Sequence, residues 1–384
     1  MPVNLPPAIP ADSILAPNAA GIARAAQLLT AGKLVILPTE TVYGIALALS
    51  SSTARHAARL IKANAAGPGA TPSPWVIHVA QPDDVLGWVP NLSPLGRRLV
   101  TKALPGPVAF EIKLDAGAQA LAEKRLGDAA GETLHDGYIT LRCPDFGTTQ
   151  EVLAAVPDPV AIIGTGTSAQ PSVYELTDLP PAAPGSPQVD AALDGGPTRY
   201  RRPSTLVRID GEQFSVVRPG VLDERILTRL ADFTILFVCS GNTCRSPMAA
   251  AIAGKMLAEK LHIPVSELPL RHIVVKSAGL HANKGMRAAV EAVDAVQAFG
   301  ADLSTHFSQP VTPDLLRRAD VIYTMTADHR DEILDLLPGA QRKTFPVDPE
   351  GDIVDPIGSP LPVYQHVAQR LSNVLQGRLS ELSL

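Results

Sequence analysis

The sequence predicts an α/β protein made of two different domains. Strand-like and helix-like segments alternate along the chain, a fresh strand–loop–helix unit begins after residue 230, and no segment is repeated. At 384 residues the chain exceeds what one hydrophobic core usually organises, so two cores are expected. We place the boundary near residue 225, which gives domains at 1–224 and 225–384.

The first domain reads as a twisted α/β domain. A helical pattern starts near Ala19 and ends at Gly32. Apolar runs bounded by turn residues predict strands, and a second apolar periodicity predicts another helix. The predicted strands cover 33–47 (with a turn), 74–80, 108–114, 138–143, 160–165 and 204–209, the second helix covers 52–64, and a connecting helix covers 221–233.

The second domain opens on the apolar strand "TILFVC", which ends at Cys239, and a helix starts near Ser246 and Pro247. The N–H groups of the loop between them, together with the positive end of the helix, form a cradle for a tetrahedral anion. Arg245 adds a bidentate donor for two phosphate oxygens. These positive surroundings favour the thiolate of Cys239, which is the form that attacks phosphorus. The predicted phosphate-binding loop contains Ser240, Gly241, Asn242, Thr243, Cys244 and Ser246.

The alternative for Cys239 is a buried structural cysteine beside a surface arginine. A bare cysteine–arginine spacing would leave that alternative open, but the strand, loop and helix in register argue against it. We therefore expect a cysteine nucleophile inside an anion site.

Composition limits the partners of the chain. A formal net charge of -5 argues against a broad nucleic-acid-binding surface. There is no signal peptide and no uncharged apolar run of about 18 residues, so neither a membrane span nor export is expected. The three cysteines Cys143, Cys239 and Cys244 offer no disulfide framework. We expect a cytoplasmic protein, and no metal site is predicted.

Residues 235–249 resemble the signature of the low-molecular-weight protein phosphatases, and the likeness extends through most of 233–384. The segments "VKSAGLHA", "GADLSTHFSQPV" and "DIVDPIGSPLPVYQ" resemble further family segments. The resemblance implies a doubly wound parallel sheet, a phosphocysteine intermediate, phosphoprotein substrates and no cofactor. It also implies that Asp355 is the general acid, since a poor leaving group needs a proton to depart.

Other residues of this domain take their expected roles from the same resemblance. Asn242 matches a residue that shapes the loop and Ser246 one that steadies the leaving thiolate, although either could be a turn residue or a helix cap. Cys244 matches a second thiol that can trap an oxidised nucleophile, and a small buried residue fits equally well. Ser277 and His306 fall on matching segments and stay outside the predicted catalytic set.

Two substrates remain open for the phosphatase. Tyrosine-directed members resemble "CLGNICRS" and carry aromatic residues after the Asp-Pro pair, whereas this chain has Thr243 in the loop and Ile357-Gly358 after Asp355-Pro356. A missing aromatic wall removes a stacking surface for a phenyl ring, and a threonine hydroxyl can bond a polar leaving group. This pattern resembles the protein-arginine phosphatases. We hold phosphoarginine and phosphotyrosine as equal hypotheses.

The first domain carries its own resemblance, which begins at "LVILPTETVYGIAL". This segment resembles the Sua5, YrdC and TsaC family of threonylcarbamoyl-AMP synthases, and the likeness continues in order to about residue 222 through "PWVIHV", "PGPVAFEI", "ITLRCPD", "TSAQPS", "DGGP", "PSTLVRI" and "VVRPG". It implies that threonine, bicarbonate and ATP (with Mg²⁺) are joined into an adenylate for tRNA modification. RNA or tRNA-modification proteins are the implied partners.

The family roles fall on seven residues of this sequence. The resemblance assigns threonine or its carboxylate to Thr39, His78, Arg142 and Ser204, and ATP to Lys62, Ser168 and Arg218. Cationic and hydroxyl side chains suit carboxylate and phosphate groups.

Several positions depart from the family pattern, and they leave two hypotheses open. The departures are Asn64, Ser73, Gln170 and Val173. In the first hypothesis the chain is a bifunctional enzyme, a synthase fused to a phosphatase. In the second, the N-terminal domain is a degenerate nucleotide- or RNA-binding module that regulates an active phosphatase.

Overall fold

The computed structural model describes residues 13–66, 74–164, 172–179 and 187–382. The chain divides into two compact units, Met1–Ala231 and Asp232–Leu384. The division falls several residues beyond the boundary predicted near residue 225, because the helix that follows this point packs on the first unit. Arg98 Nε donates to the carbonyl of Ala231 at 2.8 Å and holds the end of that helix there.

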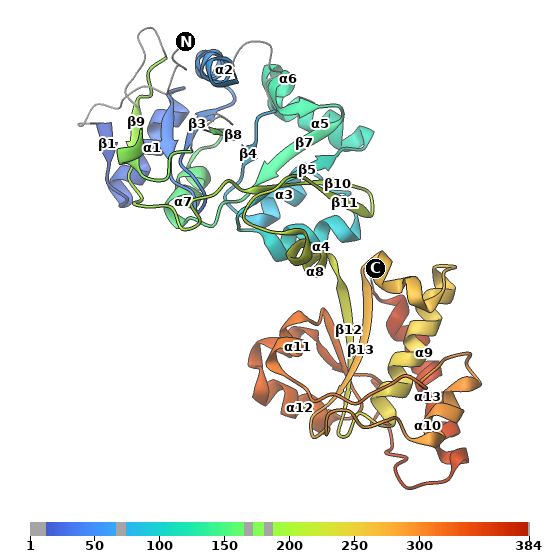
Figure 1. The fold of residues 1–384 in the computed structure, drawn as a ribbon. Helices are drawn as coiled ribbons and strands as arrows, with labels where there is room; N and C mark the ends of the chain where they lie inside the picture. The colour runs from blue at the N-terminus through green and yellow to red at the C-terminus, as the bar shows by residue number, and fades with distance from the viewer. Residues whose placement is uncertain (1–12, 67–73, 165–171, 180–186, 383–384) are drawn as a thin grey trace. The chain divides into compact units, whose positions relative to one another are not determined.

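The N-terminal unit alternates helices and strands (Figure 1). Its elements are β1 (Ile14–Leu15), α1 (Ala19–Thr30), β2 (Val35–Leu37), β3 (Gly44–Ala48), α2 (Ser52–Ala66), β4 (Ile77–His78), α3 (Pro82–Trp88), α4 (Pro94–Ala103), β5 (Val108–Lys113), α5 (Ala116–Leu126), α6 (Ala130–Thr133), β6 (Leu134–His135), β7 (Tyr138–Arg142), α7 (Gly147–Ala155), β8 (Val160–Gly164), β9 (Ala191–Leu193), β10 (Thr205–Asp210), β11 (Gln213–Arg218) and α8 (Glu224–Ala231). The predicted strand at 74–80 is reduced to the two residues of β4, and β9 and β11 were not predicted.

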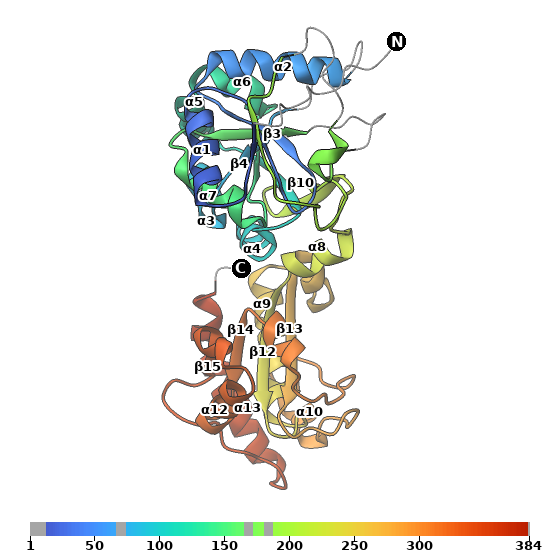
Figure 2. The same ribbon diagram turned by 90° about the vertical axis from the view of Figure 1, so that its left-hand side faces the viewer.

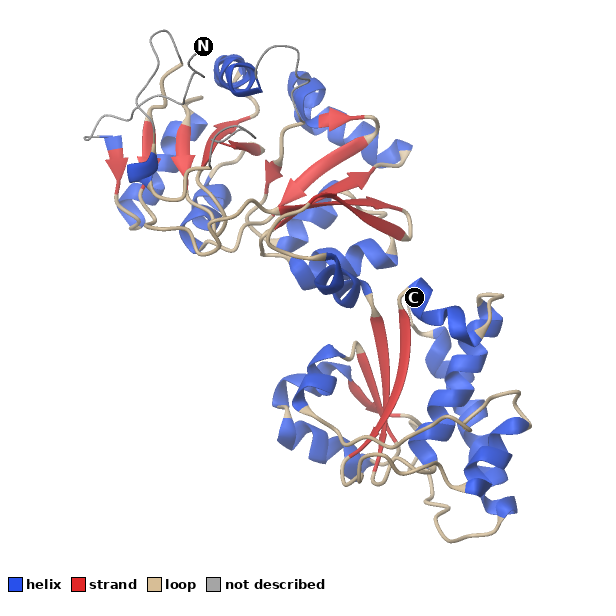
Figure 3. Cartoon of the chain, in the orientation of Figure 1, coloured by secondary structure: helices blue, strands red, loops and turns tan. Residues whose placement is uncertain are grey.

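Its strands form one mixed sheet, which Figure 3 shows in red. The strand order is β1-β9-β2-β3-β8-β4-β7-β5-β10-β11, with β6 paired to β7. Side chains of β2 alternate between two cores: Ile36 joins the core that contains residues of α2, and Val35 and Leu37 join the core that contains residues of α1 and α7. Helices α1 and α7 pack side by side (Figure 2). The sheet is therefore covered on both faces.

The C-terminal unit is a doubly wound α/β unit, as predicted. Its strands are β12 (Phe233–Cys239), β13 (Ile273–Gly279), β14 (Val321–Thr324) and β15 (Thr344–Pro346), and its helices are α9 (Arg245–Lys260), α10 (Val290–Gln297), α11 (Pro313–Arg318), α12 (Ala327–Leu336) and α13 (Leu361–Ser380). All strand pairs are parallel, in the order β13-β12-β14-β15. Helices α9, α10 and α13 cover one face, and α11 and α12 the other (Figure 1).

Strand β12 lies inside this sheet and is buried on both faces. Ile235 and Phe237 pack in the core with α9 and α13, whereas Leu236 and Val238 pack in the core with α11 and α12. A run of apolar residues without polar alternation is what such a two-sided strand requires. The carboxyl end of β12 thus places Cys239 at the edge of the sheet where ligands bind in open α/β folds.

None of the helices in the described part of the chain combines the length and the apolarity that spanning a membrane requires.

Candidate functional site

Cys239 is the last residue of β12, and its side chain is only 3% exposed. The backbone N–H of Asn242 donates to Cys239 Sγ at 3.3 Å, and the hydroxyl of Ser246 lies 3.0 Å from the same sulfur. Ser246 is in the first turn of α9, so the positive end of that helix faces the sulfur as well. This arrangement favours a negative charge on sulfur and a tetrahedral anion beside it.

The loop that carries these donors is held by Asn242, which is fully buried at φ +55°. Its side-chain amide donates to the hydroxyls of Ser246 and Ser277, both at 2.9 Å. Its amide oxygen accepts from the backbone N–H of Gln309 at 2.9 Å, and its carbonyl lies 2.8 Å from His306 Nε2. Asn242, Ser277 and His306 therefore shape the loop, and Gln309 joins them although the sequence did not indicate it.

Gly279 at the end of β13 lets the loop approach the strand. A Cβ atom at this position would lie 2.5 Å from the carbonyl oxygen of Ser240 and 2.9 Å from the backbone nitrogen of Asn242. Both contacts are to backbone, so a side chain would require the loop itself to move. The glycine of the "SAGL" segment is thus a requirement of the loop geometry.

Arg245 connects the loop to the predicted general acid. Its guanidinium is 6% exposed and donates to Asp355 Oδ2 at 2.5 Å, to the carbonyl of Ile353 at 3.1 Å and to the hydroxyl of Ser240 at 3.4 Å. The carboxylate of Asp355 is 41% exposed. The structure thus brings the predicted nucleophile loop, the predicted phosphate clamp and the predicted acid into one site.

His329 of α12 also belongs to this site, and sequence reasoning missed it. Its Nε2 lies 2.8 Å from the hydroxyl of Ser240 and its Nδ1 lies 2.8 Å from the hydroxyl of Thr326. Burial, with the nearby positive charge of Arg245, lowers the pKa of His329, so the ring is neutral near pH 7. No local pattern could have indicated this contact, because the two partners are 89 residues apart in the chain.

Thr243 and Cys244 complete the loop. Cys244 is 4% exposed and its Sγ lies 3.5 Å from the hydroxyl of Tyr364 and 3.6 Å from that of Thr243. Burial raises the pKa of the Cys244 thiol. This placement agrees with the interpretation of Cys244 as a small buried residue.

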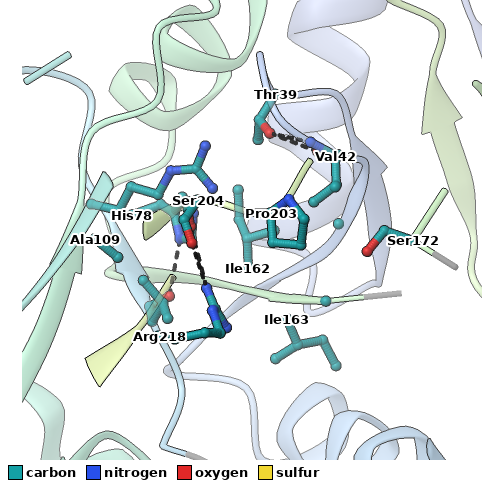
Figure 4. Close-up of a pocket in the computed structure, with 14 residues that line it drawn as sticks. Thr39, Val42, His78, Ala109, Ile162, Ile163, Ser172, Pro203, Ser204 and Arg218 are labelled. Carbon is teal, nitrogen blue, oxygen red and sulfur yellow. Dashed lines mark hydrogen bonds between the residues drawn. The ribbon is translucent and has the colours of Figure 1, made fainter. Parts of the chain in front are cut away.

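In the N-terminal unit, a cavity of about 390 Å³ gathers most of the residues that the second resemblance indicated. Figure 4 shows side chains from separate segments of the chain facing it. The predicted residues that line it are Thr39, His78, Arg142, Ser204 and Arg218.

Arg142 brings a buried guanidinium, ion-paired with Glu40, to this cavity. Its Nη2 donates to Glu40 Oε1 and to the hydroxyl of Thr41, both at 2.8 Å. Its Nε is buried and has no hydrogen-bond partner among the described residues. A buried guanidinium N–H is costly to leave unpaired, so the cavity suits a ligand that supplies an acceptor.

His78 and Arg218 extend the same surface. His78 Nδ1 lies 3.0 Å from the carbonyl of Val76, which can only accept, so Nδ1 carries the proton and Nε2 is an acceptor. Burial, with the charge of Arg142, lowers the pKa of His78 to about 3. Arg218 donates to the carbonyl of Ser204 at 3.0 Å, and burial beside Arg142 lowers its pKa. Two cations and a neutral acceptor thus meet in one cavity.

The remaining predicted ATP residues are placed differently. Lys62 lines another cavity, of about 360 Å³, together with Trp75 and Glu132, and burial lowers the pKa of Lys62 to about 8. Ser168 lies outside the described residues, as do Ser73 and Gln170.

Within the described ranges, no group of three or more histidine, cysteine, aspartate or glutamate side chains is placed to hold a metal ion.

Comparison with known proteins matches each unit to a family. The family described as low molecular weight phosphotyrosine protein phosphatase matches residues 234–383, and the Sua5/YciO/YrdC family, described as telomere recombination, matches residues 27–220.

The C-terminal unit is similar to several named proteins. A protein-arginine-phosphatase of Geobacillus stearothermophilus is 37% identical over 154 residues, which cover 39% of this chain and 95% of that protein. A protein-arginine-phosphatase of Bacillus subtilis (strain 168) is 33% identical over 153 residues, covering 38% and 95%. The solved structure of the YwlE arginine phosphatase from Geobacillus stearothermophilus has 36% identity, a TM-score of 0.33, and coverage of 39% of this chain and 91% of that one. The chain therefore belongs to the low molecular weight phosphotyrosine protein phosphatase family through its C-terminal unit and to the Sua5/YciO/YrdC family through its N-terminal unit.

Proposed function

We propose that the C-terminal phosphatase unit dephosphorylates proteins through a phosphocysteine on Cys239, and that phosphoarginine is its preferred substrate. The observation that carries the proposal is the single site in which Cys239 Sγ, the loop donors, Arg245 and Asp355 lie together. A nucleophile, an anion clamp and a proton donor are the three groups that this displacement needs.

The reaction runs in two displacements. Cys239 Sγ attacks phosphorus, the S–P bond forms, the N–P bond to the guanidine breaks, and the leaving nitrogen takes a proton from Asp355. The Asp355 carboxylate then accepts a proton from water as the water oxygen attacks phosphorus and the S–P bond breaks. The backbone N–H of Asn242, which already donates to the sulfur, and the hydroxyl of Ser246, which lies 3.0 Å from it, stabilise the departing thiolate. Because the phosphate competes for Arg245, substrate binding releases Asp355 from its ion pair.

Three observations support phosphoarginine over phosphotyrosine. The relatives at 37% and 33% identity are named protein-arginine-phosphatases. Thr243 supplies a hydroxyl to the loop, and no aromatic residue follows Asp355-Pro356, where Ile357 is 68% exposed. A polar, planar leaving group can form a hydrogen bond with the hydroxyl, and its binding is little weakened when no aromatic side chain is present to stack on it.

The test compares kcat/KM for two peptides of one sequence that differ only in carrying phosphoarginine or phosphotyrosine. We expect a clearly higher kcat/KM for the phosphoarginine peptide. A higher value for the phosphotyrosine peptide would make phosphotyrosine the substrate instead. Cys239→Ser is the control: turnover falls by roughly 10³-fold or more while vanadate binding is retained, because the loop amides and Arg245 remain. A Cys239→Ser protein that keeps a few per cent of turnover would remove Cys239 as the nucleophile.

We propose further that the N-terminal unit forms L-threonylcarbamoyl adenylate from threonine, bicarbonate and ATP. The cavity that contains the unpaired N–H of Arg142, the acceptor of His78 and the cation of Arg218 supports this proposal, since a zwitterionic amino acid and a phosphate need these groups. In the proposed reaction the threonine nitrogen attacks the carbon of bicarbonate, a C–O bond breaks and water leaves, which gives a carbamate. The carbamate oxygen then attacks the α-phosphorus of ATP, and the bond to pyrophosphate breaks. We propose that the chain works in the cytoplasm.

The competing function is a binding module without synthase activity, which the placement of Lys62 in another cavity favours. Pyrophosphate release from ATP, dependent on both threonine and bicarbonate, separates the two. Arg142→Met should abolish that release. Binding of threonine or ATP without pyrophosphate release would establish the module instead.

A further inference from the structure

The loop between β15 and α13, residues 347–360, carries Asp355, and Arg370 of α13 holds its first half. Arg370 Nε and Nη2 both lie 2.8 Å from Asp348 Oδ2, and Arg370 Nη1 donates to the carbonyl of Asp352 at 3.0 Å. Asp348 is nearly buried, and its second oxygen accepts from the backbone N–H of Glu350 at 2.9 Å. One arginine thus ties two points of the loop to a long helix.

The next residues of the loop lead directly to the site. Asp352 Oδ1 accepts from the backbone N–H of Ala327 at 2.9 Å, at the start of α12. The N–H of Ile353 donates to the carbonyl of Met325 at 2.8 Å, and the carbonyl of Ile353 accepts from Arg245. Asp355 follows two residues later. The path from Arg370 to the acid therefore runs through backbone that is fixed at Asp352 and Ile353, two residues before Asp355.

We propose that Arg370 is a positioning residue for the proton donor: it fixes the backbone at Asp352 so that Asp355 faces the leaving group. The proposal rests on the general-acid role proposed for Asp355. The carboxylate of Asp355 is 41% exposed, so packing around the side chain does not fix it. Its two oxygens are held by Arg245 and by the backbone N–H of Ile357 in the same loop, so once phosphate takes Arg245 its direction depends on the backbone of that loop. A proton donor displaced by about 1 Å can lose up to a hundredfold in rate.

The fork of Arg370 is suited to this task. Its donors reach a carboxylate oxygen and a carbonyl four residues apart in the loop, a geometry that a lysine ammonium cannot reproduce. The same helix offers a matched control in Arg378, which donates to the carbonyls of Val347 and Pro346 and packs over Tyr323. Arg378 thus anchors Pro346 at the end of β15 and Val347, the first residue of the loop, and makes none of the contacts at Asp348 or Asp352.

The experiment uses the full chain and a series of aryl phosphates whose leaving groups range from good to poor. Arg370→Met should lower kcat about tenfold or more for the poorest leaving groups and less than about threefold for the best, with the vanadate inhibition constant unchanged. Arg370→Lys should fall between wild type and Arg370→Met. Arg378→Met should change all substrates by the same factor.

The outcomes separate this proposal from the function on which it rests. Asp355→Asn is measured in the same series. If Asp355→Asn shows the leaving-group dependence and Arg370→Met does not, Arg370 has no positioning role and the function stands. If Asp355→Asn shows no such dependence, the acid role itself fails. Should Arg370→Met not fold, Arg370→Lys decides: equal losses across the series overturn the proposal, and losses that grow with poorer leaving groups support it.

Discussion

The guanidinium of Arg245 and the carboxylate of Asp355 form an ion pair, with 2.5 Å between Nη2 and Oδ2. The cation that we expect to bind phosphate is therefore already partnered by an anion of the protein. In the proposed reaction we expect phosphate to exchange with Asp355 at Arg245, and we expect the released side chain to turn toward the leaving group. Binding of the anion and placement of the acid are thus one event.

Asp355→Asn separates these two effects. The neutral amide no longer competes for Arg245, so the affinity for vanadate or phosphate should stay equal to wild type or rise a few-fold. At the same time kcat for poor leaving groups should fall by roughly 10² to 10⁴, since no proton is supplied. Inhibition constants and kcat measured on one preparation check both parts. A weaker affinity for vanadate would show that Asp355 does not compete for Arg245.

Thr243→Ile tests the choice of substrate. If the hydroxyl binds the guanidinium, or a water beside it, kcat/KM for phosphoarginine should fall about tenfold to a hundredfold, the effect of a lost hydrogen bond to a polar substrate. The value for phosphotyrosine should hold or rise, because isoleucine can pack on a ring. Equal changes for the two peptides would contradict a role of Thr243 in selectivity.

Gly279→Ala tests the close approach of β13 to the loop. The added Cβ would meet backbone atoms of Ser240 and Asn242, so we expect a loss of about 1 to 3 kcal/mol in stability and a large loss of turnover. Gly377→Ala is the control, since its Cβ would meet nothing within 4 Å on an exposed face of α13 and should be neutral or slightly stabilising. Thermal melts and kcat are compared. A fully active Gly279→Ala protein would mean that the loop tolerates another path.

The lowered pKa of His78 predicts that the stability of the N-terminal unit depends on pH. Its pKa is about 3 in the folded chain and about 6.5 when unfolded, so the unfolded state binds more protons between these values. The stability that neutral His78 contributes is present above pH 6.5 and is lost as the pH falls toward 3. His78→Asn should remove up to about 1.4 kcal/mol per pH unit of that slope.

The tryptophans make this measurement specific. The chain contains two, Trp75 and Trp88, and both are buried in the N-terminal unit. Urea unfolding followed by tryptophan fluorescence between pH 4 and 7 therefore reports on this unit within the full chain. Identical slopes for wild type and His78→Asn would show that His78 does not carry the dependence.

The sequence predicted the parts of the site that are contiguous and missed those that tertiary structure supplies. The family memberships and the α/β architecture are confirmed. Cys239 and Arg245 could be found because strand, loop and helix follow one another in the chain. His329 and Gln309 could not, because each reaches the loop from a separate segment.

Lys62 illustrates a second limit. In the extended segment that leads into β4 successive side chains point in opposite directions, so Val76 and His78 line the first cavity while Trp75 lines the cavity that contains Lys62. A motif match predicts where a residue lies in the sequence. It does not predict on which side of the sheet the side chain lies. The individual site roles remain predictions until the variants above are measured.

The supports of the Cys239 loop come from the ends of β13, α12 and two further loops, through Gly279, His329, Gln309 and Ile353. These supports are spread from Gly279 to Ile353, so a chain that ends before Ile353 lacks at least one of them. A nascent or partly unfolded chain therefore carries the nucleophile without the cradle, and phosphate turnover cannot precede completion of the fold. Phosphatase turnover by this chain therefore requires the folded C-terminal unit. Under mild stress, a loss of turnover should report unfolding before aggregation becomes visible.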